Sequence, residues 1–334
     1  MSKTTMRRFL IVTLGLALTA IPSQIVAEEI NREYHETFDT RPGMKLVLEH
    51  GDGDVTISTW SEDSLAVDVR YRAKAASIGW SKSTDFTVDF RQEGDTIHVI
   101  GHEPKRVSVG ISAFREYEYT YTIQAPSYLE LSTEGEDGNV EIGGWRGSIG
   151  LKLEDGDVNL NDIDAARIGL FLEDGDLTAD GIRGEVDVES EDGDIEISDC
   201  EITGGVIRTE DGDIEIDRCQ GSLELTLEDG DVHLRDMAAQ DLEIRSSDGS
   251  ITLSLLPSEG LDLRARSDDG DVVLDLDPAI AARFDLETDD GRIKVNAADV
   301  ADLEQERRHV RGRLGTGEGS IYVRTSDGSV TLRQ

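Results

Sequence analysis

Five acidic turns are the part of this sequence whose residue types and spacing could do chemistry. Each reads Glu-Asp-Gly-Asp, and they lie at residues 154–157, 173–176, 191–194, 210–213 and 228–231. Carboxylate oxygens are the ligands that hard cations such as Ca²⁺ and Mg²⁺ prefer. If the turns stack at the strand spacing of about 4.8 Å, their carboxylates form one column in which like charges repel unless cations occupy it. The candidate metal ligands are Glu154, Asp155, Asp157, Glu173, Asp174, Asp176, Glu191, Asp192, Asp194, Glu210, Asp211, Asp213, Glu228, Asp229 and Asp231.

The same acidic column also has a structural explanation. Tight turns favour Asp before Gly, and a charged edge keeps a protein soluble and blocks edge-to-edge strand pairing. That preference explains neither the leading Glu nor the Asp after Gly. The sequence therefore leaves two readings open, a site for divalent cations or a cationic ligand and a solvated edge. The spacing differs from that of the nonapeptide Ca²⁺-binding repeat.

The two cysteines, Cys200 and Cys219, are separated by one period of the repeat described below. Stacked coils would bring their Cα atoms to about 4.8 Å, within the range that a disulfide requires. Export to an oxidising compartment favours the bond, whereas reduced thiols would pack as small apolar residues. We expect a structural role in both cases, because the chain has no C-x-x-C spacing.

The sequence contains no recognisable catalytic motif. The six histidines are scattered without metal-ligand spacing, and no G-x-S-x-G or phosphate-binding loop occurs. Because the chain has 71 acidic residues, no single pair of carboxylates is informative. We expect a protein without enzymatic activity; the alternative is a carbohydrate-active enzyme built on a β-helix.

The formal charge of −38 narrows the choice of partners. Nucleic acid is excluded, since phosphate backbones need a basic footprint. Divalent cations, cationic peptides and an unidentified envelope or extracellular ligand fit such a surface.

A repeat positions the acidic turns. Between Gly138 and Gly249 the turn glycines recur with a nearly constant period, and the next two steps, to Gly270 and Gly291, are slightly longer. Around each glycine, β-branched residues and Leu alternate with polar residues, as in half-buried strands. The pattern predicts an all-β fold, a β-solenoid of about 18–21 residues per coil. An array of β-hairpins is the alternative, because Asp-Gly also suits a two-residue hairpin loop.

A further apolar position lies seven residues after each turn glycine. We expect it to form an inward corner that stacks from one coil to the next. Its members are Trp60, Trp145, Ile163, Ile182, Cys200, Cys219, Met237 and Leu256.

The chain divides into four predicted parts. Residues 1–27 have a basic start, an apolar run and a site for cleavage after Ala27, as in a secretory signal peptide, which leaves no transmembrane span in the mature chain. Residues 28–130 form a less regular β-rich portion that caps the solenoid, and residues 131–296 carry the regular coils. Residues 297–334 contain a helical or loop insertion and the final coils. The helical stripe consists of Val300, Leu303, Val310 and Leu314.

Tyr117, Tyr119 and Tyr121 alternate with polar residues in the N-terminal portion. One face of this predicted strand is therefore aromatic. We expect a ladder packed beneath the N-terminal portion, in preference to a glycan-binding face.

The order of these motifs resembles the bacterial putative-adhesin family, a domain of unknown function. The resemblance rests on residues 52–57 with Trp60, on 121–126, on the serial Asp-Gly-Asp turns, and on 315–319 before 326–330. It implies a β-helical fold in the cell envelope and supplies no catalytic residues. Together the features predict an exported protein of the periplasm or cell surface, or a secreted one, for adhesion, scaffolding or the capture of cations or cationic ligands.

Overall fold

The computed structural model describes residues 26–83, 86–103 and 106–334. These residues form strands and no helix, which confirms the all-β class. The predicted signal segment, apart from Val26 and Ala27 at the start of β1, lies outside the described residues. Buried and exposed residues alternate along nearly every strand, so the apolar residues of each coil face the interior.

The strands pair in two ladders. The first holds the strand before each Asp-Gly turn and runs, in spatial order, β5 (Thr87–Glu93), β6 (Thr96–His102), β2 (Lys45–Gly51), β8 (Glu130–Asp137), β10 (Ile149–Asp155), the ends of β11 (Val158–Asp174) and β12 (Leu177–Asp192), β14 (Glu201–Asp211), β16 (Gln220–Asp229), the end of β17 (Val232–Asp248), β19 (Asp262–Asp269), β25 (Gly319–Asp327), β21 (Ala282–Thr288), β24 (His309–Leu314) and β23 (Val300–Gln305).

The second ladder holds the strand after each turn. It runs β1 (Val26–Asp39), β4 (Ser64–Ser83), β7 (Arg106–Pro126), β3 (Asp54–Trp60), β9 (Val140–Gly143), the starts of β11 and β12, β13 (Ile195–Ser198), β15 (Ile214–Asp217), the start of β17, β18 (Ile251–Leu255), β20 (Val272–Leu276), β26 (Val330–Arg333) and β22 (Ile293–Asn296).

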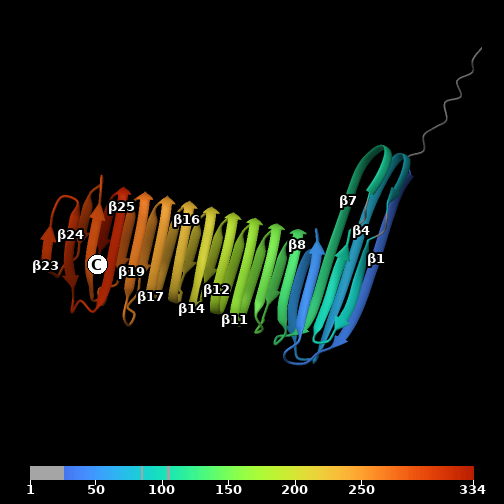
Figure 1. The fold of residues 1–334 in the computed structure, drawn as a ribbon, viewed down its shortest axis with the longest axis horizontal. Helices are drawn as coiled ribbons and strands as arrows, with labels where there is room; N and C mark the ends of the chain where they lie inside the picture. Colours follow the sequence, from blue (N-terminus) through green and yellow to red (C-terminus); the bar gives the residue numbers. More distant parts are fainter. Residues whose placement is uncertain (1–25, 84–85, 104–105) are drawn as a thin grey trace, which may run out of the picture.

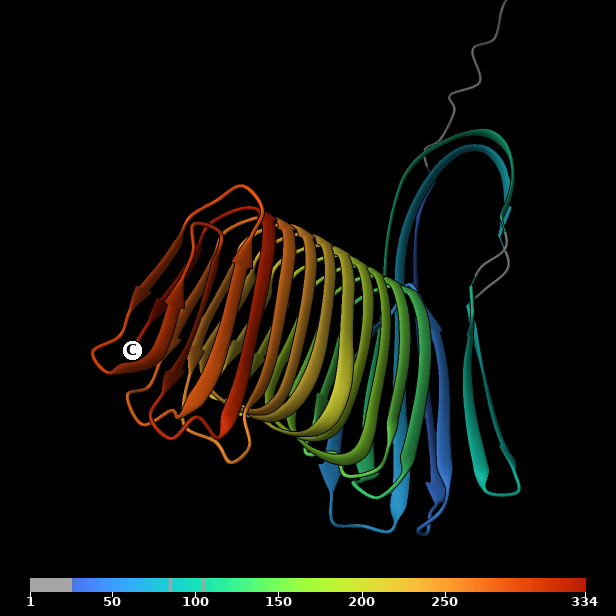
Figure 2. The ribbon, with the colours of Figure 1, turned by 60° about the vertical axis from the view of Figure 1, so that its left-hand side comes forward.

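Parallel pairing dominates both ladders (Figure 1). Val158 lies beside Leu177, and Leu177 beside Ile195, so each coil repeats the one before it in register. Among the described residues, antiparallel pairs occur only towards the two ends, in β1–β4–β7, β5–β6 and β21–β24–β23. The regular region is therefore solenoid-like rather than an array of hairpins (Figure 2).

The coils do not follow chain order at either end. Strands β2 and β3 lie between the coil of β8 and β9 and the strands β6 and β7. Strands β25 and β26 insert between the coil of β19 and β20 and that of β21 and β22. A prediction of consecutively stacked coils therefore holds for the middle of the molecule and fails at its ends.

The helical or loop insertion predicted within residues 297–334 is instead a pair of strands. Strands β23 and β24 occupy this insertion and continue the first ladder beyond β21. The open edge of β21 offers unpaired backbone groups, and strand pairing satisfies them. Val310 and Leu314 are buried as a helical stripe would require, but Leu303 is 48% exposed.

The N-terminal portion forms a long three-stranded sheet, β1–β4–β7, that projects beyond the coils (Figure 1). At its base Phe86 packs against Tyr71 and Tyr119, with ring centroids 5.1 and 4.9 Å apart. Tyr119 and Tyr121 are buried, as in the predicted ladder, whereas Tyr117 is 40% exposed.

Candidate functional site

The acidic turns stack in register along one edge of the solenoid. Asp155 lies beside Asp174, Asp174 beside Asp192, and the series continues through Asp211 to Asp229. Each turn glycine from Gly156 to Gly249 donates its backbone N–H to the carbonyl of the Asp that precedes the next glycine; the N–O distance from Gly193 to Asp211 is 3.2 Å. The structure thus brings the predicted column together.

The glycines of this column are required by close backbone contact. Gly212 has a φ of 132°, a conformation that residues with side chains rarely adopt. A Cβ on Gly212 would lie 2.2 Å from the carbonyl oxygen of Gly193 in the neighbouring coil. The turn edge is therefore a tightly stacked column of backbone.

The Asp after each glycine has a structural role that the sequence did not reveal. Its Oδ1 accepts a hydrogen bond from the backbone N–H at the same position of the next coil; Asp194 Oδ1 accepts from Asp213 at 2.9 Å. The acceptors of this series are Asp54, Asn139, Asp157, Asp176, Asp194, Asp213, Asp231 and Asp271. Asn139 in this column was the available signal, because Asn and Asp share the accepting oxygen but not the charge.

The carboxylates before each glycine are not used in this way. Among the described residues, the Glu and Asp that precede the five glycines have no ion-pair partner, and all but the half-buried Glu173 are exposed. Among the described residues, no three of these carboxylates bring ligand oxygens within 4.8 Å of one another, so a cation would require their side chains to turn towards it. They remain the part of the predicted set that could hold a cation.

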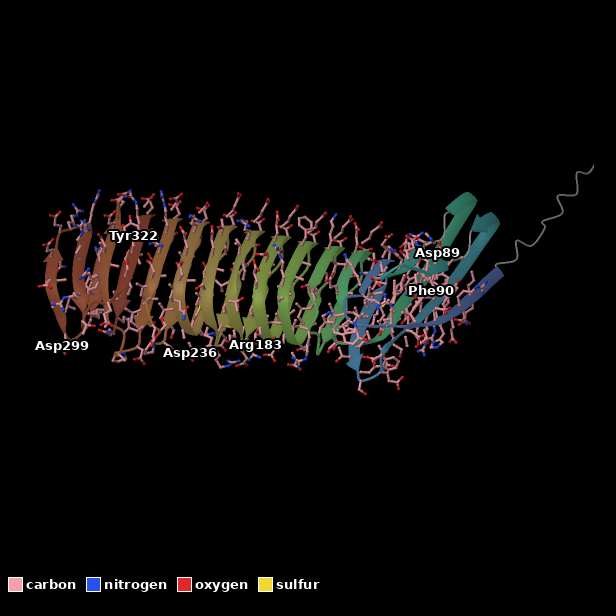
Figure 3. All side chains as sticks on the ribbon, turned by 60° about the horizontal axis from the view of Figure 1, so that its bottom comes forward. Asp89, Phe90, Arg183, Asp236, Asp299 and Tyr322 are labelled. Atoms are coloured by element: carbon pink, nitrogen blue, oxygen red, sulfur yellow. A yellow bond between two sulfur atoms is a disulfide. The ribbon has the colours of Figure 1, made fainter. Side chains whose placement is uncertain are left out.

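The opposite edge of the solenoid is built differently. A groove of about 830 Å³ follows it, with the predicted corner column along its floor. Ile163, Ile182 and Cys200 of that column are buried as predicted, whereas Leu256 is 38% exposed, so the inward position was wrong there. Beside the groove, Arg183 contacts Asp164 at 3.8 Å and Glu201 at 3.0 Å. Figure 3 shows Arg183 and Asp236 on this edge. Three arginines and five carboxylates line the groove, so both signs of charge are present along this edge.

Cys200 and Cys219 form a disulfide within that corner column. Their Cα atoms are 4.5 Å apart on adjacent coils, and both residues are buried. The bond joins two neighbouring coils covalently, which is a structural role.

One group of potential metal ligands was not predicted from the sequence. Asp285, Glu287 and His309 place ligand atoms within 4.8 Å of one another. They meet because β24 pairs antiparallel with β21, which the predicted helix did not allow. Arg311 contacts Asp285 at 3.0 Å and Arg324 contacts Glu287 at 3.3 Å. These ion pairs already compensate the two carboxylates.

The first turn of the solenoid contains a buried histidine. His50 Nδ1 donates to the carbonyl of Gly53 at 2.8 Å, and burial lowers the pKa of His50 to about 4. Glu103 accepts from the backbone N–H of Asp52 at 3.2 Å. Burial, reinforced by the Asp52 charge, raises the pKa of Glu103. The two groups therefore favour their neutral forms at this end.

Comparison with known proteins identifies a matching sequence family. The family model described as Toastrack DUF4097 matches residues 43–276 and 219–333. No curated protein matches the chain. Within the described residues, no helix has the length and apolar character needed to cross a membrane.

Several solved structures align along most of the chain. A putative adhesin from Parabacteroides distasonis shares 9% identity over 90% of this chain and 97% of its own, with a TM-score of 0.41. One from Bacteroides fragilis shares 11% identity over 91% and 97%, with a TM-score of 0.34. One from Parabacteroides merdae shares 11% identity over 91% and 96%, with a TM-score of 0.30. Similarity at this level carries no argument about activity.

Proposed function

Because the chain belongs to the Toastrack family DUF4097, a domain of unknown function, we propose that it is an exported, non-enzymatic protein of the cell envelope whose solenoid serves adhesion or scaffolding. Coils of about 18–21 residues give it a long surface, and repeat proteins use such surfaces for binding. The signal-like residues 1–27 support export. If export occurs, the chain isolated from cells starts at Glu28; an N-terminus at residue 1 would contradict it.

The proposed ligands of the turn edge are divalent cations or a cationic partner. The observation that carries this proposal is the stacked series of Glu and Asp before the turn glycines, none of which has an ion-pair partner among the described residues. Carboxylates stacked at about 4.8 Å repel one another, and a hard cation with oxygen ligands would relieve that repulsion.

The Asp after each glycine contributes less to such binding. One of its oxygens already accepts a backbone N–H from the next coil, as Asp176 Oδ1 does from Asp194 at 2.9 Å. Cations would therefore be held mainly by the Glu and Asp on the other side of the glycine, from two neighbouring coils at once.

Thermal unfolding in EDTA and then in millimolar Ca²⁺ or Mg²⁺ tests this proposal. Binding to the folded state raises the melting temperature, and we expect a rise of several degrees. The triple variant D174N/D192N/D211N should lose most of that rise. The control E141Q/E185Q/E189Q removes the same charge from exposed sites on the coil faces and should keep it. An unchanged melting temperature together with no calorimetric heat would exclude cation capture.

A further inference from the structure

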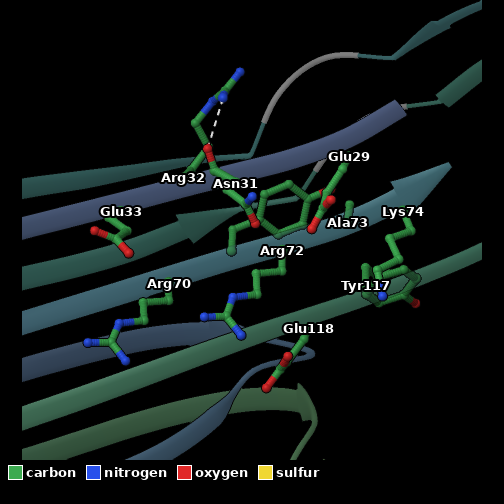
Figure 4. A pocket seen from close by; sticks show the side chains of 11 residues that line it. Glu29, Asn31, Arg32, Glu33, Arg70, Arg72, Ala73, Lys74, Tyr117 and Glu118 are labelled. Atoms are coloured by element: carbon green, nitrogen blue, oxygen red, sulfur yellow. Dashed lines mark hydrogen bonds between the residues drawn. The ribbon is translucent and has the colours of Figure 1, made fainter. Parts of the chain in front are cut away.

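Three potential ligands near the C-terminal end of the first ladder differ from the other carboxylates of the chain. Although the sequence has 71 acidic residues, Asp285, Glu287 and His309 are the only group, within the part of the chain that the structure describes, whose three ligand atoms lie within 4.8 Å of one another. In the hollow on the β1–β4–β7 sheet, by contrast, Glu33 and Glu118 lie among basic residues, and no such group of described residues forms there (Figure 4). The convergence of ligand atoms, rather than the number of carboxylates, therefore distinguishes this place.

Two paired strands place the group on the outer face of the ladder. In β21, Asp285 and Glu287 alternate with the buried Phe284 and Leu286, so both carboxylates point outwards. The antiparallel register of β24 sets His309 directly opposite Glu287. The Cβ atoms of such a pair are about 4.5–5.5 Å apart, which is close enough for the two side chains to share one ion.

Each carboxylate uses one oxygen for an ion pair and turns the other towards His309. Arg311 contacts Asp285 Oδ2 at 3.0 Å, and Arg324 contacts Glu287 Oε2 at 3.3 Å. The other two oxygens, Asp285 Oδ1 and Glu287 Oε1, lie 2.7 and 3.7 Å from His309 Nε2. The arginines thus orient the carboxylates, as the outer partners of metal ligands do, while three donor atoms converge between the strands.

The distances and the donor atoms fit a divalent transition-metal ion. Two ligands held about 2.0–2.1 Å from a tetrahedral Zn²⁺ lie about 3.4 Å apart, a value between the two distances measured from His309 Nε2. One imidazole nitrogen with two carboxylate oxygens suits Zn²⁺, whereas Ca²⁺ and Mg²⁺ prefer oxygen ligands alone. Three protein ligands leave a fourth position for water or for an atom of another molecule.

Without a metal, the contacts of His309 Nε2 conflict. This nitrogen lies 2.7 Å from Asp285 Oδ1 and 2.8 Å from Arg311 Nε. A protonated Nε2 can donate to Asp285, but it then meets the N–H of Arg311. An unprotonated Nε2 can accept from Arg311, but its lone pair then faces a carboxylate oxygen. A cation bound to Nε2 attracts that oxygen, and the Arg311 side chain, which is 53% exposed, can turn into the solvent.

We propose that Asp285, Glu287 and His309 bind a divalent transition-metal ion such as Zn²⁺. The ion joins β21 to β24 and so fixes the C-terminal insertion to the coils. This site lies in other coils than the five acidic turns, whose candidate ligands are all carboxylates, and it does not depend on cation binding there.

Isothermal titration calorimetry with Zn²⁺ tests the proposal on the untagged protein as cells produce it. Millimolar Mg²⁺ in the buffer occupies any hard-cation sites of the turn edge. We expect the parent to bind one Zn²⁺ per chain. Loss of a residue that only orients a ligand weakens metal binding roughly 10- to 100-fold, so H309Q, which removes a ligand, should weaken it by about 100-fold or more.

Three further variants separate this site from other carboxylates and histidines. E287Q removes a second ligand and should also lose binding, and the melting temperature in EDTA shows whether each variant is folded. The control H102Q removes a histidine whose Nε2 contacts one carboxylate, that of Asp89 at 3.0 Å, and which belongs to no converging group among the described residues. H102Q and the turn-edge variant D174N/D192N/D211N should bind Zn²⁺ like the parent.

The melting temperature provides a second readout. Zn²⁺ should raise it in the parent and not in H309Q, because only binding to the folded state is stabilising. Absence of Zn²⁺ binding by the parent would overturn the proposal, as would equal weakening by H309Q and H102Q. Loss of binding in D174N/D192N/D211N with none in H309Q would also overturn it, since the ion would then belong to the turn edge.

Discussion

The chain turns at both edges of the solenoid, but the two edges differ in backbone conformation and in what the neighbouring coils contact. At the turn edge, Gly193 and Gly212 have φ values of 126° and 132°, and the next coil approaches too closely for any side chain. At the opposite edge, Asp199 and Arg218 have φ values of 52° and 53°, within the left-handed region that Asp tolerates. One edge is stacked backbone, and the other is stacked side chains.

This difference assigns different constraints to the two edges. At the turn edge, close backbone contact requires the glycine, and the hydrogen bond to the next coil requires an Asp or Asn after it. Neither constraint involves the preceding Glu and Asp, so these side chains could bind a ligand. The opposite edge needs an apolar corner residue and contains the disulfide, and its side chains carry charges of both signs. A binding function is therefore easier to place on the turn edge, where the free carboxylates have a single sign.

The largest expected effect comes from a side chain at the turn glycine. G212A should destabilise the protein by about 4 kcal/mol, through backbone strain and the 2.2 Å approach to the Gly193 carbonyl. G181A, at a φ of 69° on the opposite edge, should cost only about 1 kcal/mol, because its nearest neighbour is 3.6 Å from the added Cβ. Urea unfolding measures the destabilisation caused by each variant. Equal destabilisation by G212A and G181A would contradict the proposed difference between the two edges.

The disulfide should be the largest single contribution of the opposite edge. Opening a 19-residue loop lowers the free energy of unfolding by about 3 kcal/mol. We expect C200A/C219A to unfold at lower denaturant than the oxidised parent, and the reduced parent to behave similarly. Intact mass should be two hydrogens below the thiol form. Two thiols that alkylate without reductant would contradict the bond.

Acid should weaken the first turn of the solenoid. The pKa of His50 is about 4 in the folded protein and 6.5 in the unfolded chain. Between these two pH values His50 is protonated in the unfolded chain and neutral in the folded protein. The free energy of unfolding therefore falls as the pH drops from about 6.5 to about 4. The loss is about 3 kcal/mol.

H50L provides the control for this pH dependence, because Leu does not titrate and Leu153 and Leu172 likewise stand three residues before their turn glycines. Chemical unfolding between pH 7 and pH 4 should show a smaller loss in this variant. The raised pKa of Glu103 contributes in the opposite direction, since its neutral form is favoured in the fold, and it is common to both proteins. Parallel pH profiles for parent and variant would rule out His50 as the cause.

The smallest expected effect separates the charge of the turn edge from its hydrogen bonds. D213A removes the acceptor for the Asp231 backbone N–H, at 2.8 Å, and should cost about 1.5 kcal/mol. D213N keeps an accepting oxygen, as Asn139 does, and should cost less than about 0.5 kcal/mol. Thermal unfolding in EDTA makes the comparison without cations. Equal losses would show that the charge, not the hydrogen bond, is required.

The columns of the regular coils were predictable, because a nearly constant period leaves few ways to stack like residues. The register of Asp155, Asp174 and Asp192 follows directly from that period. The hydrogen bond from Asp213 to Asp194 was not predictable, since it depends on the backbone geometry of two stacked turns.

The strands of the C-terminal insertion were also missed, because their pairing depends on which edge is left open rather than on local pattern. Strand β24 pairs with β21 although its residues Val310 and Leu314 also suit a helical stripe. The group of Asp285, Glu287 and His309 was hidden for the same reason.

The insertion of β25 and β26 has a consequence for the order of assembly. Among the described residues, β21 and β22 pair with the preceding coils only through this inserted coil, because Phe284 lies beside Ile321 and Ile321 beside Leu263. Residues 282–314 can therefore join the solenoid in this register only after residues 319–333 have been synthesised. Until then the backbone groups at the edge of β19 and β20 are unpaired and could pair with another strand. Once β25 and β26 have paired with this edge, they provide the edge on which β21 and β22 pair.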